Sequence, residues 1–277
     1  MKGMAVRMEK KIFFTDLDGT LLNDKKVITP KTREILAKIT EAGHYLVFIS
    51  GRPMMSVIEA REGLSISDKN LYLIASNGGV IYDAEKRQIL KENRLTYEQT
   101  DYVLKYCEQA GVHSHTYTDD AIVSKRQSEE LTFYQKTIHM PSIITEDIIG
   151  SLDKPPLKCI AISGEKRKLD VIKEGLSNWA KGQVQLMFSN DRLLEMIPIS
   201  SGKGTALKWL SEYLGVSIEN TMAAGDMEND ISMIEVAGVG VAMLNGAPQV
   251  KAIANKVTPF DNNNDGLVPI LEEFFEC

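Results

Sequence analysis

Apolar segments of strand length alternate with amphipathic segments in the first part of the chain. Residues 11–15 and 45–49 are rich in aromatic and β-branched side chains, which is typical of buried strands. Between them, Thr29 and Pro30 predict the start of a helix, and apolar residues recur on one helical face until Gly43. The pattern therefore predicts a strand–helix–strand unit.

The same alternation returns in the last part of the chain. A helix predicted at residues 203–214 precedes a strand at 221–224, and a further helix precedes a strand at 239–243. Alternation of this kind favours parallel strands covered by helices on both faces. We predict an α/β fold in which the two ends of the chain build one doubly wound parallel sheet.

The middle of the chain has a different pattern. Two short strands are predicted on either side of Asp119 and Asp120, and two adjacent strands at residues 184–188 and 193–197. Adjacent strands joined by tight turns favour an antiparallel sheet and hence a separate α+β domain. We predict a core of residues 1–83 and 191–277, with residues 84–190 inserted as a smaller domain.

Composition and charge narrow the possible partners. The chain has 277 residues, of which 43% are hydrophobic, and its formal charge of −6 provides no broad basic surface for nucleic acid or an anionic membrane. The three cysteines, Cys107, Cys159 and Cys277, are far apart in sequence, so we expect reduced thiols. Residues 1–11 lack the apolar stretch of a signal peptide, which predicts a cytoplasmic protein.

Polar clusters follow several of the predicted strands. In open parallel sheets, ligands bind outside the carboxyl ends of the strands, so these clusters are candidates for one shared site. A lysine at the start of the helix predicted at residues 203–214 adds a positive charge. The clusters are Asp16-Leu17-Asp18-Gly19-Thr20, Ser50-Gly51-Arg52, Gly225-Asp226-Met227-Glu228-Asn229-Asp230, and Lys203 between Gly202 and Gly204.

The carboxylates of these clusters imply a metal ion. Asp16, Asp18, Asp226 and Asp230 would meet at one site, where two like charges about 4 Å apart repel by roughly 4 kcal/mol at an effective dielectric near 20. A fold keeps such a cluster when a cation occupies it. Oxygen ligands without histidine or cysteine are typical of Mg²⁺, which also binds substrate phosphate.

Two further residues favour phosphate binding. Lys203 lies at the positive end of a helix dipole, a position that is unfavourable for a cation unless a carboxylate or phosphate offsets it. Ser50 and the following amides offer neutral donors where a helix begins. Taken alone, each has an ordinary explanation: an Asp-Gly turn, a surface lysine or a helix cap. The presence of all four clusters, each after a predicted strand or at the start of a predicted helix, favours a functional site.

These motifs resemble those of the haloacid dehalogenase-like phosphohydrolases. Asp16-Leu17-Asp18-Gly19-Thr20 resembles the first motif of that family, Ser50 the second, Lys203 the third, and Gly225-Asp226 with Asn229-Asp230 the fourth. The insert between the second and third motifs resembles the α/β cap of the Cof-type subfamily. The resemblance implies a Rossmann-like core and a magnesium-dependent phosphatase of small phosphorylated metabolites, such as sugar phosphates or phosphorylated cofactors.

The resemblance also implies a role for each site residue. Asp16 would attack phosphorus to form an aspartyl-phosphate, and Asp18 would serve as general acid and base. We expect neighbouring negative groups to raise the pKa of Asp18. The implied metal ligands are Asp16, Asp18 through its carbonyl, Asp226, Asn229 and Asp230, and the implied phosphate-binding residues are Ser50, Gly51, Arg52, Lys203 and Asn229.

Two other functions remain open on the same motifs. A phosphomutase would pass the phosphoryl group to a second hydroxyl, and a non-catalytic protein would only bind phosphorylated metabolites. A separate segment, residues 261–272, fits the residue pattern of a calcium-binding EF-hand loop. The strand predicted before it and Pro269 within it favour a polar turn instead.

Overall fold

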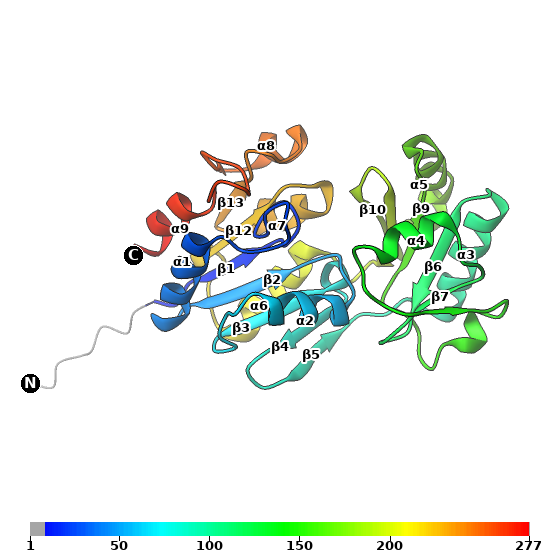
Figure 1. Ribbon diagram of the computed structural model, residues 1–277, viewed down its shortest axis with the longest axis horizontal. Helices are drawn as coiled ribbons and strands as arrows, with labels where there is room; N and C mark the ends of the chain where they lie inside the picture. Colours follow the sequence, from blue (N-terminus) through cyan, green and yellow to red (C-terminus); the bar gives the residue numbers. More distant parts are fainter. Residues whose placement is uncertain (1–8, 277) are drawn as a thin grey trace, which may run out of the picture.

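The computed structural model describes residues 9–276 and contains two β-sheets. Residues 1–8, which belong to the segment without a predicted signal peptide, and Cys277 lie outside the described residues. Figure 1 shows the larger sheet with its helices on the left and the smaller, green unit on the right. The chain crosses from the first unit to the second and back once.

The larger sheet has eight strands, and six of them are parallel. This confirms the predicted parallel sheet, and an antiparallel hairpin extends it at one edge. The sequence did not predict that hairpin. In spatial order the strands are β14 (Lys256–Val257), β13 (Val239–Ala242), β12 (Thr221–Gly225), β1 (Ile12–Thr15), β2 (Tyr45–Ile49), β3 (Leu71–Ala75), β4 (Val80–Asp83) and β5 (Gln88–Glu92).

Helices cover both faces of this sheet because successive residues of its buried strands point to opposite sides. Phe13 packs in the cluster that contains Leu36 and Leu271, whereas Phe14 packs in the cluster that contains Leu207. The helices of the first face are α1 (Pro30–Glu41), α2 (Met54–Gly63) and α9 (Val268–Phe275). Those of the second are α6 (Lys203–Leu214), α7 (Ile231–Val236) and α8 (Pro248–Ile253).

The smaller unit, called the cap below, has a six-stranded sheet. Its strands are antiparallel apart from the pair β7 and β8, which confirms the predicted α+β unit. Helices α3 (Tyr97–Gln109) and α5 (Lys166–Ala180) cover one face, and α4 (Glu129–Gln135) covers part of the other. The strand order is β10 (Val184–Asn190), β11 (Leu193–Pro198), β9 (Cys159–Ile162), β6 (His113–Tyr117), β7 (Ile122–Ser124) and β8 (Ser142–Ile144).

The two sheets divide the chain at points that differ from the predicted limits at residues 84 and 190. The first limit falls inside the β4–β5 hairpin of the larger sheet, and the second falls inside the β10–β11 hairpin of the cap. Each hairpin stays on one sheet because its strands are hydrogen-bonded to each other. The crossings therefore follow β5 and β11. Asn93 lies on the first crossing and donates from Nδ2 to the carbonyl of Ser200 on the second, at 3.3 Å.

Cys107 and Cys159 are buried free thiols. The segment before residues 261–266 contains the strand β14, in agreement with the prediction of a polar turn there. Within the described part of the chain, the helices are too short or too polar to cross a bilayer.

Candidate active site

Three of the predicted clusters meet where neighbouring parallel strands end. Thr15, the last residue of β1, pairs with Phe48 of β2 on one side and with Ala224 of β12 on the other. The residues that follow these strands therefore lie next to one another, and the amide of Asp16 donates to the carbonyl of Ala224 at 3.0 Å. This geometry explains why clusters that are distant in sequence come together.

Lys203, the first residue of α6, also lies at the site. Its side chain is fully buried, and Nζ lies 2.5 Å from Oδ1 of Asp16 and 2.5 Å from Oδ1 of Asp230. Burial alone would lower the pKa of Lys203, but the two carboxylates raise it above its ordinary value. Lys203 is thus a permanent cation behind the two carboxylates.

Three buried carboxylates form a cluster that suits a metal ion. Asp16, Asp226 and Asp230 each place a carboxylate oxygen within 4.8 Å of the others. Burial and the neighbouring negative charges raise the pKa of Asp16 well above its usual range and that of Asp226 to about 7. A hard divalent cation would offset this repulsion, and oxygen donors are the ligands that Mg²⁺ prefers.

Backbone groups hold these carboxylates in place. Oδ2 of Asp230 accepts hydrogen bonds from the amides of Asp226 and Met227, at 2.9 and 3.0 Å. The hydroxyl of Thr20 donates to Oδ1 of Asp226 at 3.0 Å. Gly19 has a φ of +80°, and a Cβ at that position would lie 2.5 Å from Oδ2 of Asp226. The first motif therefore needs glycine at this position both for its backbone conformation and for space.

Asp18 has a different environment from the one that was predicted. Its carboxylate accepts two hydrogen bonds from the guanidinium of Arg52, both 2.8 Å, and one from Lys26 at 2.6 Å. Burial favours the protonated form, but the two cations outweigh it and lower the pKa of Asp18. The expectation of a raised pKa is therefore wrong for this arrangement, because the side chain faces two cations and not the carboxylate cluster.

The loop after β2 places neutral donors beside the carboxylates. The hydroxyl oxygen of Ser50 accepts from the amide of Arg52 at 3.2 Å. Ser50, Gly51, Arg52 and Asn229 all line the same cavity. The side-chain amide of Asn229 donates to Oδ1 of Asn77 at 3.0 Å. The predicted phosphate-binding residues thus lie together, apart from Lys203, which lies behind the cavity wall.

The cap closes over these residues and leaves a cavity of about 250 Å³. The cap residues in its wall come from α4, from the turn after α4, and from the β10–β11 hairpin. None of them was predicted as a site residue, although Ser128 followed by two glutamates is a signal for the start of a helix. They are Phe133, Tyr134, Thr137, Ile138, Ser189, Asn190, Leu193 and Glu195.

Asn77 of the core was also not predicted to have a role in the site. Ser76, Asn77 and Gly78 all have left-handed backbone conformations, with φ values of 51°, 51° and 92°. Asn77 is fully buried; its amide donates to the carbonyl of Ser50, and its carbonyl accepts from the amide of Gly202. It therefore ties the loop after β2 to the segment that leads into Lys203.

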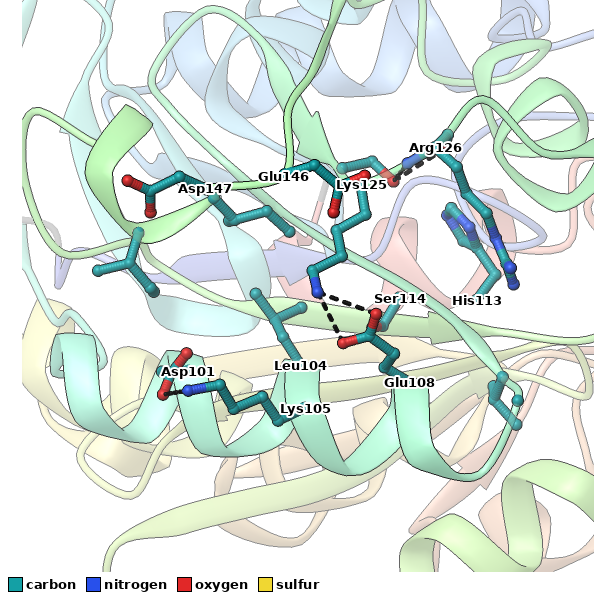
Figure 2. A pocket seen from close by; sticks show the side chains of 15 residues that line it. Asp101, Leu104, Lys105, Glu108, His113, Ser114, Lys125, Arg126, Glu146 and Asp147 are labelled. Carbon is teal, nitrogen blue, oxygen red and sulfur yellow. Dashed lines mark hydrogen bonds and ion pairs between the residues drawn. The ribbon is translucent and has the colours of Figure 1, made fainter.

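A larger hollow of about 350 Å³ lies within the cap, and its lining residues include none of the carboxylate cluster. Figure 2 shows that charged side chains of its wall pair with each other: Lys125 with Glu108, and Lys105 with Asp101. The wall of this hollow contains none of the predicted motif residues, whereas the smaller cavity is lined by Asp16, Asp226 and Asp230. The carboxylate cavity is the better candidate for the active site.

His113 and His115 lie on β6 of the cap sheet. A hydrogen bond of 3.2 Å joins their rings, and His115 is 2.9 Å from the hydroxyl of Tyr117. Tyr117 in turn donates to the hydroxyl of Tyr134 on α4 at 2.7 Å. This buried polar chain fastens α4, which lines the cavity, to the cap sheet.

Comparisons with known proteins agree with this geometry. Residues 13–271 match the family model of haloacid dehalogenase-like hydrolases. A 5-amino-6-(5-phospho-D-ribitylamino)uracil phosphatase of Bacillus subtilis is 29% identical over 90% of this chain and 93% of its own length. A pyridoxal phosphate phosphatase of Escherichia coli is 28% identical over 95% of this chain and 98% of its own.

A solved structure extends the likeness to three dimensions. The crystal structure of a haloacid dehalogenase-like hydrolase from Bacteroides thetaiotaomicron superimposes with a TM-score of 0.85 and is 30% identical, covering 96% of this chain and all of that one. The match includes both the core and the cap. The chain therefore belongs to the haloacid dehalogenase-like hydrolase family.

Proposed function

We propose that this protein is a magnesium-dependent phosphatase that hydrolyses small phosphate monoesters, with Asp16 as the nucleophile. The observation that carries the proposal is the arrangement of Asp16 beside Lys203, Asp226 and Asp230 at the bottom of a cavity covered by the cap. Relatives that are phosphatases of small phosphorylated metabolites support the same class of reaction.

The residues present fit a magnesium ion. The carboxylates of Asp16 and Asp226 and the backbone carbonyl of Asp18 would hold it, and Asn229 and Asp230 would complete or orient its surroundings. When bound, the ion supplies positive charge that neutralises the phosphate and the carboxylates. The separation of 4.8 Å or less among oxygens of the carboxylates of Asp16, Asp226 and Asp230 supports this assignment.

The reaction would proceed in two steps on the residues of this chain. In the first, a carboxylate oxygen of Asp16 forms a bond to phosphorus, the bond to the ester oxygen breaks, and Asp18 donates a proton to that oxygen. In the second, Asp18 removes a proton from water, the water oxygen attacks phosphorus, and the acyl phosphate bond breaks. The products are inorganic phosphate and the free carboxylate of Asp16.

Asp18 must change partners during this cycle. Its hydrogen bonds to Arg52 and Lys26 favour the ionised form, whereas proton donation needs the protonated form. A phosphate dianion bound at Ser50 and Gly51 would compete for the guanidinium of Arg52. Substrate binding would thus weaken the pairing that keeps Asp18 ionised.

The cavity limits the class of substrate. Its volume of about 250 Å³ suits a phosphate group with a compact leaving group, and the cap would block a phosphoprotein. Phe133, Tyr134 and Ile138 offer apolar surface, and Asn190 and Glu195 offer polar groups. Sugar phosphates and phosphorylated cofactors fit this mixture. The cytoplasmic location expected from the sequence belongs to the same proposal.

The test is release of inorganic phosphate from a panel of phosphorylated metabolites in the presence of Mg²⁺, with wild type and Asp16→Asn compared. Wild type should release phosphate and the variant should not, while circular dichroism shows the same fold for both. Accumulation of an isomer of the substrate would indicate a phosphomutase instead. Binding of metabolites without turnover would indicate a non-catalytic protein, and full activity of Asp16→Asn would refute the nucleophile.

A further inference from the structure

A buried ion pair lies where the cap meets the cavity. Lys158, immediately before β9, donates from Nζ to Oε2 of Glu195 in β11 at 2.8 Å, and the two side chains are 1% and 2% exposed. Glu195 is the register partner of Ile160, so both charged side chains lie on the face of the cap sheet that carries α4. Glu195 also lines the carboxylate cavity.

The pair contacts the core at Gly51. Nζ of Lys158 donates to the carbonyl oxygen of Gly51 at 2.6 Å. A Cβ on Gly51 would lie only 2.9 Å from Oε1 of Glu195, so the carboxylate rests directly against the Gly51 backbone. The cap therefore closes on the loop after β2 at a position where only glycine leaves enough room.

This contact controls one peptide group of the loop. The carbonyl of the Gly51–Arg52 peptide accepts from Lys158, and the N–H of the same peptide donates to the hydroxyl oxygen of Ser50 at 3.2 Å. The peptide is planar, with C=O and N–H pointing in opposite directions, so fixing one end fixes the other. The hydroxyl oxygen of Ser50 accepts this hydrogen bond, so the hydroxyl proton of Ser50 can be donated to another acceptor, such as a phosphate oxygen.

Holding the cap closed would not require the buried charges of Lys158 and Glu195. A buried ion pair is often no more stabilising than apolar residues of the same size. The cavity already holds the carboxylates of Asp16, Asp226 and Asp230. An unpaired glutamate in its wall would add a further negative charge and would repel an incoming phosphate. What the pair adds is a directed hydrogen bond to the Gly51 carbonyl, which an apolar pair could not make.

We propose that Lys158 and Glu195 are positioning residues that couple closure of the cap to the orientation of the phosphate-binding loop. Lys158 belongs to the cap and Gly51 to the core, so the peptide is held only while the cap is closed. Glu195 orients the ammonium, and its other oxygen accepts a hydrogen bond from Ser189 of the neighbouring strand. The inference rests on the proposed function because it assigns the phosphate to this loop.

The test compares wild type with Lys158→Met and with the double variant Lys158→Met/Glu195→Met. The double variant removes both charges, so neither is left buried without a partner. Lys154→Met is the matched control, because Lys154 is an exposed cap lysine that pairs with Asp119. For each protein, titration calorimetry with inorganic phosphate and Mg²⁺ gives the affinity. The kcat/KM for p-nitrophenyl phosphate and the midpoint of thermal unfolding are measured in parallel.

We expect both Lys158 variants to bind phosphate about 10-fold to 100-fold more weakly and to lose a similar factor in kcat/KM, the size of effect produced by small misplacements in active sites. The double variant should unfold within a few degrees of wild type, and Lys154→Met should match wild type in all three measurements. A double variant with unchanged phosphate affinity and kcat/KM would overturn the inference, whatever its unfolding midpoint. A purely structural pair would change that midpoint alone.

These measurements distinguish a failure of the proposed phosphatase function from a failure of the positioning role. A wild type that binds phosphate but hydrolyses no ester would overturn the proposed function, while the calorimetric comparison would still decide the role of Lys158. An active wild type with an equally active double variant would overturn the positioning role alone. A wild type that neither binds phosphate nor hydrolyses any ester would overturn both.

Discussion

Nζ of Lys203 lies 2.5 Å from Oδ1 of Asp16, although 187 positions separate the two residues in the chain. The cap is inserted between them, so this contact joins the two halves of the core that the insertion separates. The same ammonium contacts Asp230. One fully buried ammonium group thus links the first, third and fourth motifs.

Removing this cation should affect both stability and activity. Lys203→Met leaves Asp16 and Asp230 buried without their partner, a change that typically costs about 3–5 kcal/mol. We expect the free energy of unfolding in urea to fall by that amount, with partial recovery on addition of Mg²⁺. Lys208→Met, on an exposed position of the same helix, should match wild type. Equal stability of the two variants would contradict the importance of the buried contact.

Asp18→Asn should lower kcat at least about 100-fold for alkyl phosphates, because asparagine cannot donate or accept the proton. The loss should be smaller for p-nitrophenyl phosphate, whose leaving group needs less protonation. The measurement is kcat for both substrates with wild type and variant. Equal losses on the two substrates would show that Asp18 does not act as the general acid in the first step.

Removal of divalent metal should abolish turnover. Without a cation, the repulsion among Asp16, Asp226 and Asp230 disfavours the ionised forms that catalysis needs. Dialysis against EDTA should therefore stop phosphate release, and Mg²⁺ should restore it. Asp226→Asn should raise the Mg²⁺ concentration for half-maximal activity at least about 10-fold. Asp170→Asn, on an exposed position of α5, is the control, and full activity in EDTA would exclude the metal role.

The buried histidines should make the cap sensitive to acid. Burial lowers the pKa of His113 to about 4 and that of His115 well below its ordinary value. The unfolded chain, with pKa values near 6.5, therefore binds more protons than the folded chain below that pH. Stability is retained above about pH 6.5 and falls as the pH drops toward 4, by up to about 1.4 kcal/mol per pH unit for each histidine.

The positions of the two tryptophans allow the pH dependence of stability to be measured in the cap alone. Trp179 lies in α5 of the cap and Trp209 in α6 of the core, so in a Trp209→Phe background the emission of Trp179 reports on the cap. The free energy of unfolding in urea is measured at pH 7 and at pH 5. It should fall more between these pH values in the protein that keeps His115 than in the His115→Gln variant. The same pH dependence in both proteins would contradict the assignment.

Sequence alone predicted the parts of the site that depend on strand ends. Parallel strands end at one edge of the sheet, so a polar residue after β1, β2 or β12 had few other places to lie, and Asp16, Ser50 and Asp226 are found there. Lys203 followed from its position at a helix start, where a cation needs a negative partner.

The parts that depend on side-chain direction could not be predicted in this way. The sequence shows Asp18 two residues from Asp16 but does not show that Arg52 and Lys26 turn its carboxylate away from the cluster. The edge strand β5 has few buried residues, so its alternation is weak and the β4–β5 hairpin was missed. Helix α4 has only seven residues and two buried side chains, too few for a clear helical period.

The hydrogen bond from Asn93 to Ser200 joins the two connections between the cap and the core. Nδ2 of Asn93 also approaches the carbonyl of Gly78 at 3.3 Å, so both crossings are tied to the core at one place. A lid hinged at one place can swing without stretching either of its two connections. If the cap opens about this point, the contact of Lys158 with Gly51 breaks, whereas the β10–β11 hairpin and the contact of Lys203 with Asp16 stay intact.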